Sequence, residues 1–296
     1  GGGKGIEITS SSFNFISDNA ITTFDANGEG IRIGGSGGSN SNKIFNNNIN
    51  TSGTTAEGIR MRIGSSNIFI NNSIVTSGSR STGLAFGTGH SNNNSFITTI
   101  IKTTHATSNA TVVETGFHNF TITDSIVNAL GAAGFDLFVE SATGGEWNFT
   151  NVTGSSGESI DFGWRVGAKG TLNVIWYVDA YANYSNSTDA PDANISAFNN
   201  INGLQFSKLT GQDGRIPRQT VLEYKITNDS SGGSVSTYYS NYTFNARSIY
   251  DESLTQSWNM TTNRFLIFTF NPYVIVPLIN FVDPTPPNAT ITRNNS

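Results

Sequence analysis

The sequence predicts an all-β protein in which a stack of repeated coils is followed by a smaller antiparallel domain. Charged residues make up only 12% of the chain, fewer than in an ordinary soluble domain. Apolar residues make up 36%, which is enough apolar surface for the chain to fold. Gly, Ser, Thr and Asn are abundant, as is typical of short strands joined by turns. No stretch shows the 3.6-residue apolar period of an amphipathic helix.

A glycine or other small residue followed by apolar residues recurs through the first half of the chain. The steps from Gly5 to Gly30, Gly58 and Gly83 are 25, 28 and 25 residues. A unit of this length with short strands cannot bury its apolar face alone, so its copies must stack. The repeat therefore predicts a parallel β-helix of about six to seven coils, in which like residues lie above like at the strand spacing of about 4.8 Å.

Three columns of side chains run through the repeat. An asparagine recurs in each unit, with a second polar residue five positions later and an isoleucine seven positions later. We expect the isoleucines to form a buried aliphatic ladder, and the first asparagines to form a structural amide ladder at a turn. The predicted amide ladder is Asn14, Asn42, Asn67, Asn94 and Asn119; the second column is Asn19, Asn47, Asn72, Thr99 and Asp124; the isoleucines are Ile21, Ile49, Ile74, Ile101 and Ile126.

Residues 5 to about 165 resemble the right-handed parallel β-helix repeats of pectate-lyase-like folds and of many secreted archaeal and bacterial surface proteins. The resemblance lies in the repeat pattern and covers about half of the chain. It implies a right-handed β-helix, to which we assign residues 1–168. It implies little about activity.

After about residue 170 the columns stop, and strand patterns of five to eight residues alternate with turn clusters. This texture predicts a small antiparallel β-sandwich over residues 169–272. The stretch DAPDANI at 189–195, followed by TGQDG at 210–214, resembles the carboxypeptidase-regulatory-like, or transthyretin-like, module. That resemblance implies a non-catalytic spacer or adhesion domain.

Residues 273–296 contain a proline-rich stretch and end in a short strand pattern. We expect a stiff linker followed by the first strand of a further domain, or by a strand that pairs with another subunit. The chain does not begin with methionine, and we interpret it as a piece of a longer or processed protein.

Composition and motifs exclude several classes of function. A net charge of -5 without a basic stripe argues against nucleic acid as a partner. The chain has no cysteine, which excludes disulfides and thiolate metal sites, and it has no apolar run of the length that spans a membrane. No nucleotide, zinc-protease or EF-hand motif occurs, so we expect no cofactor.

Two charged clusters are expected on the outer face of the coils. One contains Glu29, Arg32, Glu57 and Arg60; the other contains Asp136, Glu158 and Asp161. The acidic cluster has the chemistry of a calcium site or of an acid/base pair for a glycosidic bond, with Trp147, Phe162 and Trp164 close to it in sequence. The clusters lie three or more coils apart, about 14 Å or beyond, so solvated ion pairs on a rod are the favoured interpretation.

Histidines offer no metal site, because His90, His105 and His118 occupy different positions in their coils. We therefore predict no catalytic and no metal-binding residues.

Asn-x-Ser/Thr sites are the strongest chemical signal, and glycosylation at such a site requires an exposed loop in a secreted protein. The predicted glycosylation sites are Asn50, Asn71, Asn93, Asn109, Asn148, Asn151, Asn183, Asn186, Asn194, Asn228, Asn241, Asn259 and Asn288. Asn50, Asn109, Asn186 and Asn228 lie in polar, turn-like stretches and are favoured. Asn119 is a poor candidate because it is assigned to the amide ladder.

Together these features predict a non-enzymatic extracellular or cell-surface protein with a structural or adhesive role. The β-helix would serve as the rigid rod of a glycosylated filament or stalk subunit. The expected partners are N-linked glycans, copies of the chain itself in a filament or surface layer, and carbohydrate. The alternative is a carbohydrate-active lyase or glycoside hydrolase that uses an outer face of the β-helix.

Overall fold

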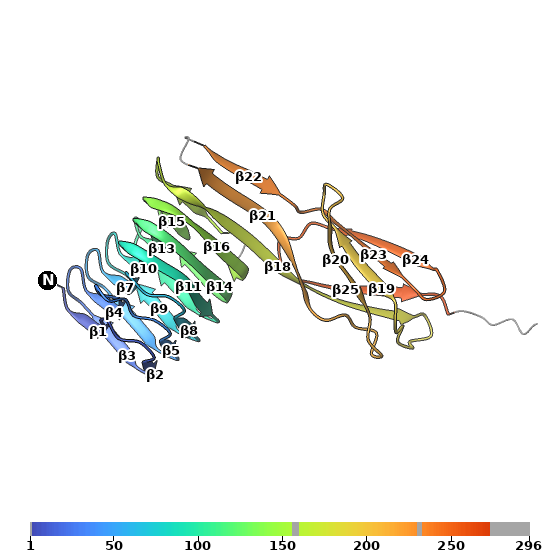
Figure 1. The fold of residues 1–296 in the computed structure, drawn as a ribbon, viewed down its shortest axis with the longest axis horizontal. Coiled ribbons are helices and arrows are strands. Elements are labelled where there is room, and N and C mark those ends of the chain that lie inside the picture. The colour runs from blue at the N-terminus through green and yellow to red at the C-terminus, as the bar shows by residue number, and fades with distance from the viewer. Residues whose placement is uncertain (1, 156–159, 230–232, 273–296) are drawn as a thin grey trace, which may run out of the picture.

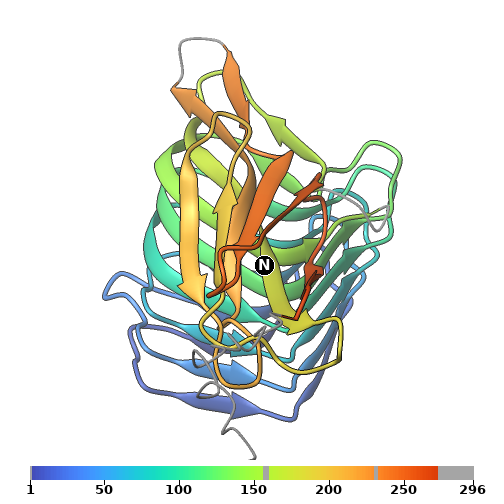
Figure 2. The same ribbon diagram turned by 90° about the vertical axis from the view of Figure 1, so that its right-hand side faces the viewer.

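The chain folds entirely from β-strands in the part that the structure, a computed structural model, describes: residues 2–155, 160–229 and 233–272. Parallel strands form a solenoid of about six turns, and a small antiparallel sheet lies beyond it (Figure 1). The predicted all-β fold with a parallel β-helix is therefore confirmed. Figure 2, which looks along the long axis, shows the coils stacked one behind another.

One wall of the solenoid is a seven-stranded parallel sheet, sheet A. Each strand follows a turn and pairs with its counterpart in the next coil. Its strands, in spatial order, are β1 (Lys4–Ile8), β4 (Glu29–Ile33), β7 (Glu57–Met61), β10 (Thr82–Phe86), β13 (Asn109–Val113), β15 (Leu137–Val139) and β17 (Phe162–Trp164).

The remaining walls belong to sheet B, in which each early coil contributes two short strands separated by a corner. The first set is β2 (Phe15–Ser17), β5 (Lys43–Phe45), β8 (Ile68–Ile70) and β11 (Gly89–Ile97); the second is β3 (Ala20–Thr23), β6 (Asn48–Thr51), β9 (Ser73–Thr76) and β12 (Ile100–Thr103). In the later coils both sets merge into single long strands, β14 (Gly116–Ala129) and β16 (Ala142–Thr153).

The repeat carries a glycine because the backbone at this position packs directly against the aliphatic ladder. Ile49 and Ile74 are stacked in register and fully buried. A Cβ added at Gly58 would lie 2.2 Å from Ile74 Cγ2 and 2.5 Å from the Gly83 carbonyl oxygen. A side chain at this position would collide with the core, so the small residue and the isoleucine recur together.

The fifth coil departs from the predicted register by one residue. Ile101 pairs with Val127, which is fully buried, while Ile126 pairs with Ile100. Val127 therefore continues the aliphatic ladder in place of the predicted Ile126.

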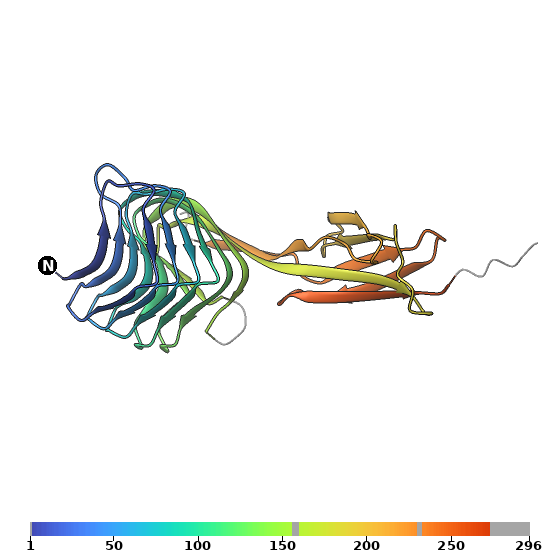
Figure 3. The ribbon, with the colours of Figure 1, turned by 90° about the horizontal axis from the view of Figure 1, so that it is seen from below.

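The second unit is joined to the solenoid by β18 (Lys169–Tyr184), a strand of 16 residues. Its first part pairs with β16 in the last coil, and its second part pairs in parallel with β25 (Arg264–Phe270). The hairpin β21 (Gln219–Asp229) and β22 (Ser234–Tyr238) continues sheet B on the other side of β18. The predicted boundary at residues 168 and 169 thus falls at the start of a strand that both units share (Figure 3).

An antiparallel sheet of four strands, sheet C, completes the second unit. Its strands, in spatial order, are β20 (Leu204–Leu209), β19 (Asn194–Phe198), β23 (Tyr242–Arg247) and β24 (Ser253–Trp258). The buried apolar side chains of both units form one continuous cluster from Ile8 to Phe270. The predicted tail at 273–296 lies outside the described residues.

Candidate functional site on the outer face of sheet A

Charged side chains gather on the outer face of sheet A where the sequence predicted an ion cluster. In adjacent coils Glu29 is in register with Glu57, and Arg32 with Arg60. Within each coil the arginine pairs with the glutamate three residues earlier: Arg32 Nη1 lies 3.6 Å from Glu29 Oε2, and Arg60 Nη1 contacts Glu57 Oε1. Parallel stacking therefore converts a sequence repeat into two rows of opposite charge.

Arg60 also reaches a carboxylate that sequence reasoning missed. Its Nη2 lies 2.9 Å from Oε2 of Glu114, two coils further along the sheet. The guanidinium passes Gly87, where an added Cβ would lie 2.9 Å from Nη2. The absence of a side chain at Gly87 is the signal in the sequence that this contact is sterically allowed.

The cluster is largely shielded from water. The side chains of Glu57 and Arg60 are 13% and 15% exposed. Burial raises the pKa of Glu57 to about 7, and repulsion from Glu114 and Glu29 acts in the same direction, while the attraction of Arg60 opposes it. Oε2 of Glu57 is buried without a hydrogen-bond partner, which fits a site that disfavours the charged form of this carboxyl.

A groove of about 400 Å³ runs beside these residues. Glu57, Glu114 and Glu140 contribute carboxyl groups to it, and Val112 and Phe138 contribute apolar surface. A carboxyl whose pKa is raised to about 7, beside a second carboxyl group, has the chemistry used for general acid and base catalysis. The groove is thus the part of the solenoid face best suited to chemistry.

The predicted acidic cluster does not assemble on the outer face. Asp136 is fully buried, and its carboxylate accepts hydrogen bonds from the backbone N–H groups of Ala129 (2.9 Å), Ser155 (3.1 Å) and Asp161 (3.0 Å). Asp136 therefore holds a turn together, which corrects the expectation that it points outward. Glu158 lies outside the described residues.

The histidines do not form a site either. His118 is buried, and burial lowers its pKa to about 4, whereas the His90 Nδ1 accepts a hydrogen bond from the backbone N–H of Phe117. Within residues 2–155, 160–229 and 233–272, no three His, Asp or Glu side chains come together as metal ligands. No helix in the same residues is long and apolar enough to cross a membrane.

The predicted amide ladder runs through four coils. Both the backbone N–H and Nδ2 of Asn14 donate to Oδ1 of Asn42, and the same pair of bonds joins Asn42 to Asn67 and Asn67 to Asn94, at 2.8 to 3.0 Å. Asn119 does not continue the ladder. Asn94 is in register with Phe120, and Asn119 instead accepts a hydrogen bond from the Glu146 backbone N–H.

The loss of a corner explains this break. A residue with positive φ precedes each member of the ladder: Phe13, Ser41, Ser66 and Asn93. In the fifth coil β14 runs straight through the equivalent position. The second polar column shifts by one residue in the same coil, because Ser125 Oγ, not Asp124, accepts the hydrogen bond from the Thr99 backbone N–H.

The predicted glycosylation sites occupy different environments. Asn71, Asn93, Asn186, Asn241 and Asn259 are exposed. Those with partly covered side chains are Asn50, Asn109, Asn148, Asn151, Asn183 and Asn194. Asn228 is only 8% exposed and lies within β21, so the turn expected at that position is absent. Asn288 lies outside the described residues.

No protein-family model matches the chain, and no curated protein matches it in sequence.

Proposed function

We propose that the chain is a rigid structural or adhesive element of an extracellular surface protein, such as a stalk or a filament subunit. The observation that carries the proposal is the continuity of β18, which is hydrogen-bonded to β16 in the solenoid and to β25 in the second unit. A strand shared in this way leaves no flexible linker between the two units. Force applied at one end of the molecule would be transmitted to the other through backbone hydrogen bonds.

The side-chain ladders support the same role. Successive coils are joined by main-chain hydrogen bonds and, through the first four coils, also by hydrogen bonds between stacked asparagine side chains, which water does not replace easily where they are buried. The exposed Asn-x-Ser/Thr sites support an extracellular location in a host that glycosylates such sites. Asn186 is exposed and lies in a turn in which its Oδ1 accepts a hydrogen bond from the Thr188 hydroxyl at 2.7 Å.

Small-angle X-ray scattering with negative-stain electron microscopy tests the rod. We expect one elongated particle shape with a fixed angle between solenoid and second unit, and glycopeptides that contain Asn186 in material from the native host. Particles with a broad range of angles between the units would refute the rigid connection. Unmodified peptides for all exposed sites would refute the glycoprotein assignment.

A second candidate is a glycoside hydrolase centred on Glu57 and Glu114, and the raised pKa of Glu57 favours it. Glu57 would donate a proton to the leaving oxygen, and Glu114 would act as base or nucleophile. Release of reducing ends from a panel of polysaccharides tests this activity. Glu57→Gln should abolish it, while Glu7→Gln, on the same face outside the groove, should leave it unchanged; a panel without any reducing-end release would exclude it.

A further inference from the structure

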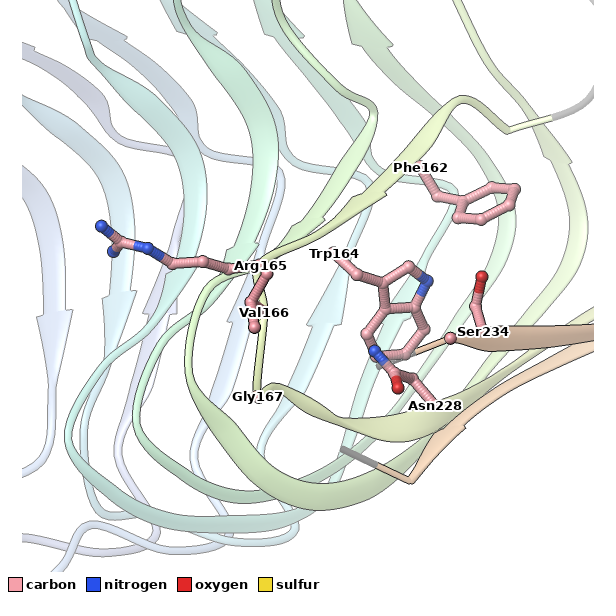
Figure 4. Close-up of a pocket in the computed structure, with 8 residues that line it drawn as sticks. Phe162, Trp164, Arg165, Val166, Gly167, Asn228 and Ser234 are labelled. Carbon is pink, nitrogen blue, oxygen red and sulfur yellow. The ribbon is translucent and has the colours of Figure 1, made fainter. Parts of the chain in front are cut away.

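A second pocket lies where the solenoid meets the second unit. β17 is the last strand of sheet A and pairs only with β15 in the described chain, whereas sheet B continues through β18 to the hairpin β21–β22. This offset leaves a pocket of about 340 Å³ between β17 and the hairpin (Figure 4). Residues from three separate segments line it: the end of sheet A, β21 and β22.

The aromatic walls of the pocket come from positions that face the core. Phe162 is in register with Leu137, and Trp164 with Val139, both of which are fully buried. Phe162 and Trp164 remain partly exposed because no further strand of sheet A covers them. Trp164 packs against Trp147 with a ring separation of 5.5 Å, so the wall is rigidly supported.

The indole N–H of Trp164 has no acceptor, which sets it apart from the other tryptophans. Trp147 Nε1 donates to the His118 carbonyl at 2.8 Å, Trp176 Nε1 to Glu223 at 2.6 Å, and Trp258 Nε1 to Gln256 at 3.1 Å. Trp164 Nε1 is buried without any hydrogen-bond partner. Buried donors are normally paired, and Figure 4 shows this nitrogen turned toward the space between Phe162 and Ser234.

The described residues that line the pocket place no charged group inside it. Arg165 is the one charged residue among the described residues that line it, and its guanidinium is turned away, 2.5 Å from the carboxylate of Glu140 (Figure 4). Asn228 and Ser234 supply an amide and a hydroxyl, each of which can donate and accept. Among these described residues a charged ligand would find no counter-charge, and a purely apolar ligand would leave the indole N–H unpaired.

We propose that this pocket binds one ring of a neutral sugar. Its C–H faces would pack on Phe162 and Trp164, one hydroxyl oxygen would accept the Trp164 N–H, and a neighbouring hydroxyl would pair with Ser234. The site is separate from the groove on sheet A and does not depend on the structural role proposed above. It would give a rod of this kind a specific carbohydrate ligand.

The test uses the full chain on an array of neutral hexose and N-acetylhexosamine oligosaccharides, followed by calorimetry with the strongest binder. Trp164→Phe keeps an aromatic wall but removes the N–H and part of the ring that packs on Trp147, so we expect about tenfold weaker binding by a chain that still unfolds cooperatively. Trp258→Phe is the matched control, because its indole lies on β24 and is already paired; it should bind like the wild type.

Phe162→Ala tests the other wall and should also weaken binding. Binding to free oligosaccharides identifies a polysaccharide ligand, and binding only to the same sugars on a carrier protein identifies a glycoprotein ligand; either supports the proposal. The proposal fails if the array shows no neutral-sugar binding, or if Trp164→Phe binds as tightly as the wild type.

Discussion

The amide ladder should be a major source of stability, and Asn67 is the position at which to test it. Asn67 is fully buried in the third coil. Its Nδ2 donates to the Ser39 carbonyl and to Asn94 Oδ1, both at 3.0 Å, and its Oδ1 accepts from the backbone N–H and Nδ2 of Asn42 at 3.0 and 2.8 Å. Asn67→Ala therefore removes four hydrogen bonds at once.

The expected loss follows from those four bonds. A buried hydrogen bond contributes about 1 kcal/mol net, and a buried group left unpaired costs about 1 to 3 kcal/mol. We expect Asn67→Ala to lower the free energy of unfolding by about 4 kcal/mol, a large part of the 5 to 15 kcal/mol that is typical of a folded protein.

Asn14→Ala is the matched control. Asn14 stands at the first coil, is partly exposed and donates to Asn42 in the same way, but water can replace most of what its side chain does. Its substitution should cost about 1 kcal/mol. Urea unfolding followed by circular dichroism measures both variants; a cost for Asn67→Ala within 1 kcal/mol of that for Asn14→Ala would refute the reasoning.

Three further predictions concern single positions. Burial raises the pKa of Glu57 to about 7, so the stability that depends on its protonated form is complete below pH 4.5 and is lost as the pH rises through 7. The melting temperature should therefore fall between pH 5 and pH 8, and Glu57→Gln should make this fall smaller. Burial lowers the pKa of His118 to about 4, so the stability that depends on its neutral imidazole is present above pH 6.5 and is lost as the pH falls toward 4. His118→Gln should therefore reduce the fall of the melting temperature at acid pH. An unchanged pH dependence in this variant would contradict the lowered pKa of His118. Gly58→Ala should destabilise the chain by about 1 to 3 kcal/mol through overpacking against Ile74, whereas Gly233→Ala, with no atom within 4 Å of the added Cβ, should leave the urea midpoint unchanged.

The solenoid was predictable from the sequence because the same packing contacts recur from coil to coil. Gly58 must be small for the same reason as Gly30 and Gly83, and each lies against an isoleucine of the same ladder. Strict spacing in the sequence therefore reports strict stacking in space. The row of charges at Glu29, Glu57, Arg32 and Arg60 was predictable on the same grounds.

The fifth coil shows where this reasoning fails. An asparagine at 119 lies at the expected spacing, but the chain has lost the corner that would place it beside Asn94. A shift of one residue changes which side chains face the core, so Asn119, Asp124 and Ile126 all leave their predicted columns together. Residue spacing cannot reveal this shift, because the old and new positions carry similar residues: Asp124 and Ser125 are both polar, and Ile126 and Val127 are both apolar.

Contacts between distant coils were also hidden from the sequence. The pairing of Arg60 with Glu114 depends on a guanidinium that crosses an intervening coil at Gly87. The aromatic pocket depends on sheet B continuing past the last strand of sheet A. Neither feature is part of the repeat: the ion pair spans two coils, and the pocket lies where the repeat ends.

The stacking that stiffens the solenoid also restricts where a ligand can bind. Its interior is filled by buried apolar side chains from Ile8 to Val174, and the corners of its first four coils are occupied by hydrogen-bonded asparagine side chains, so neither can open without loss of several contacts. The places left for a ligand are the outer face of a sheet and a position where one sheet extends beyond the last strand of the other. The groove at Glu57 is a candidate for the first kind of site, and the pocket proposed at Trp164 is a candidate for the second. A rod built on this plan can therefore gain a ligand without losing stiffness, because both sites lie outside the ladders that hold the coils together.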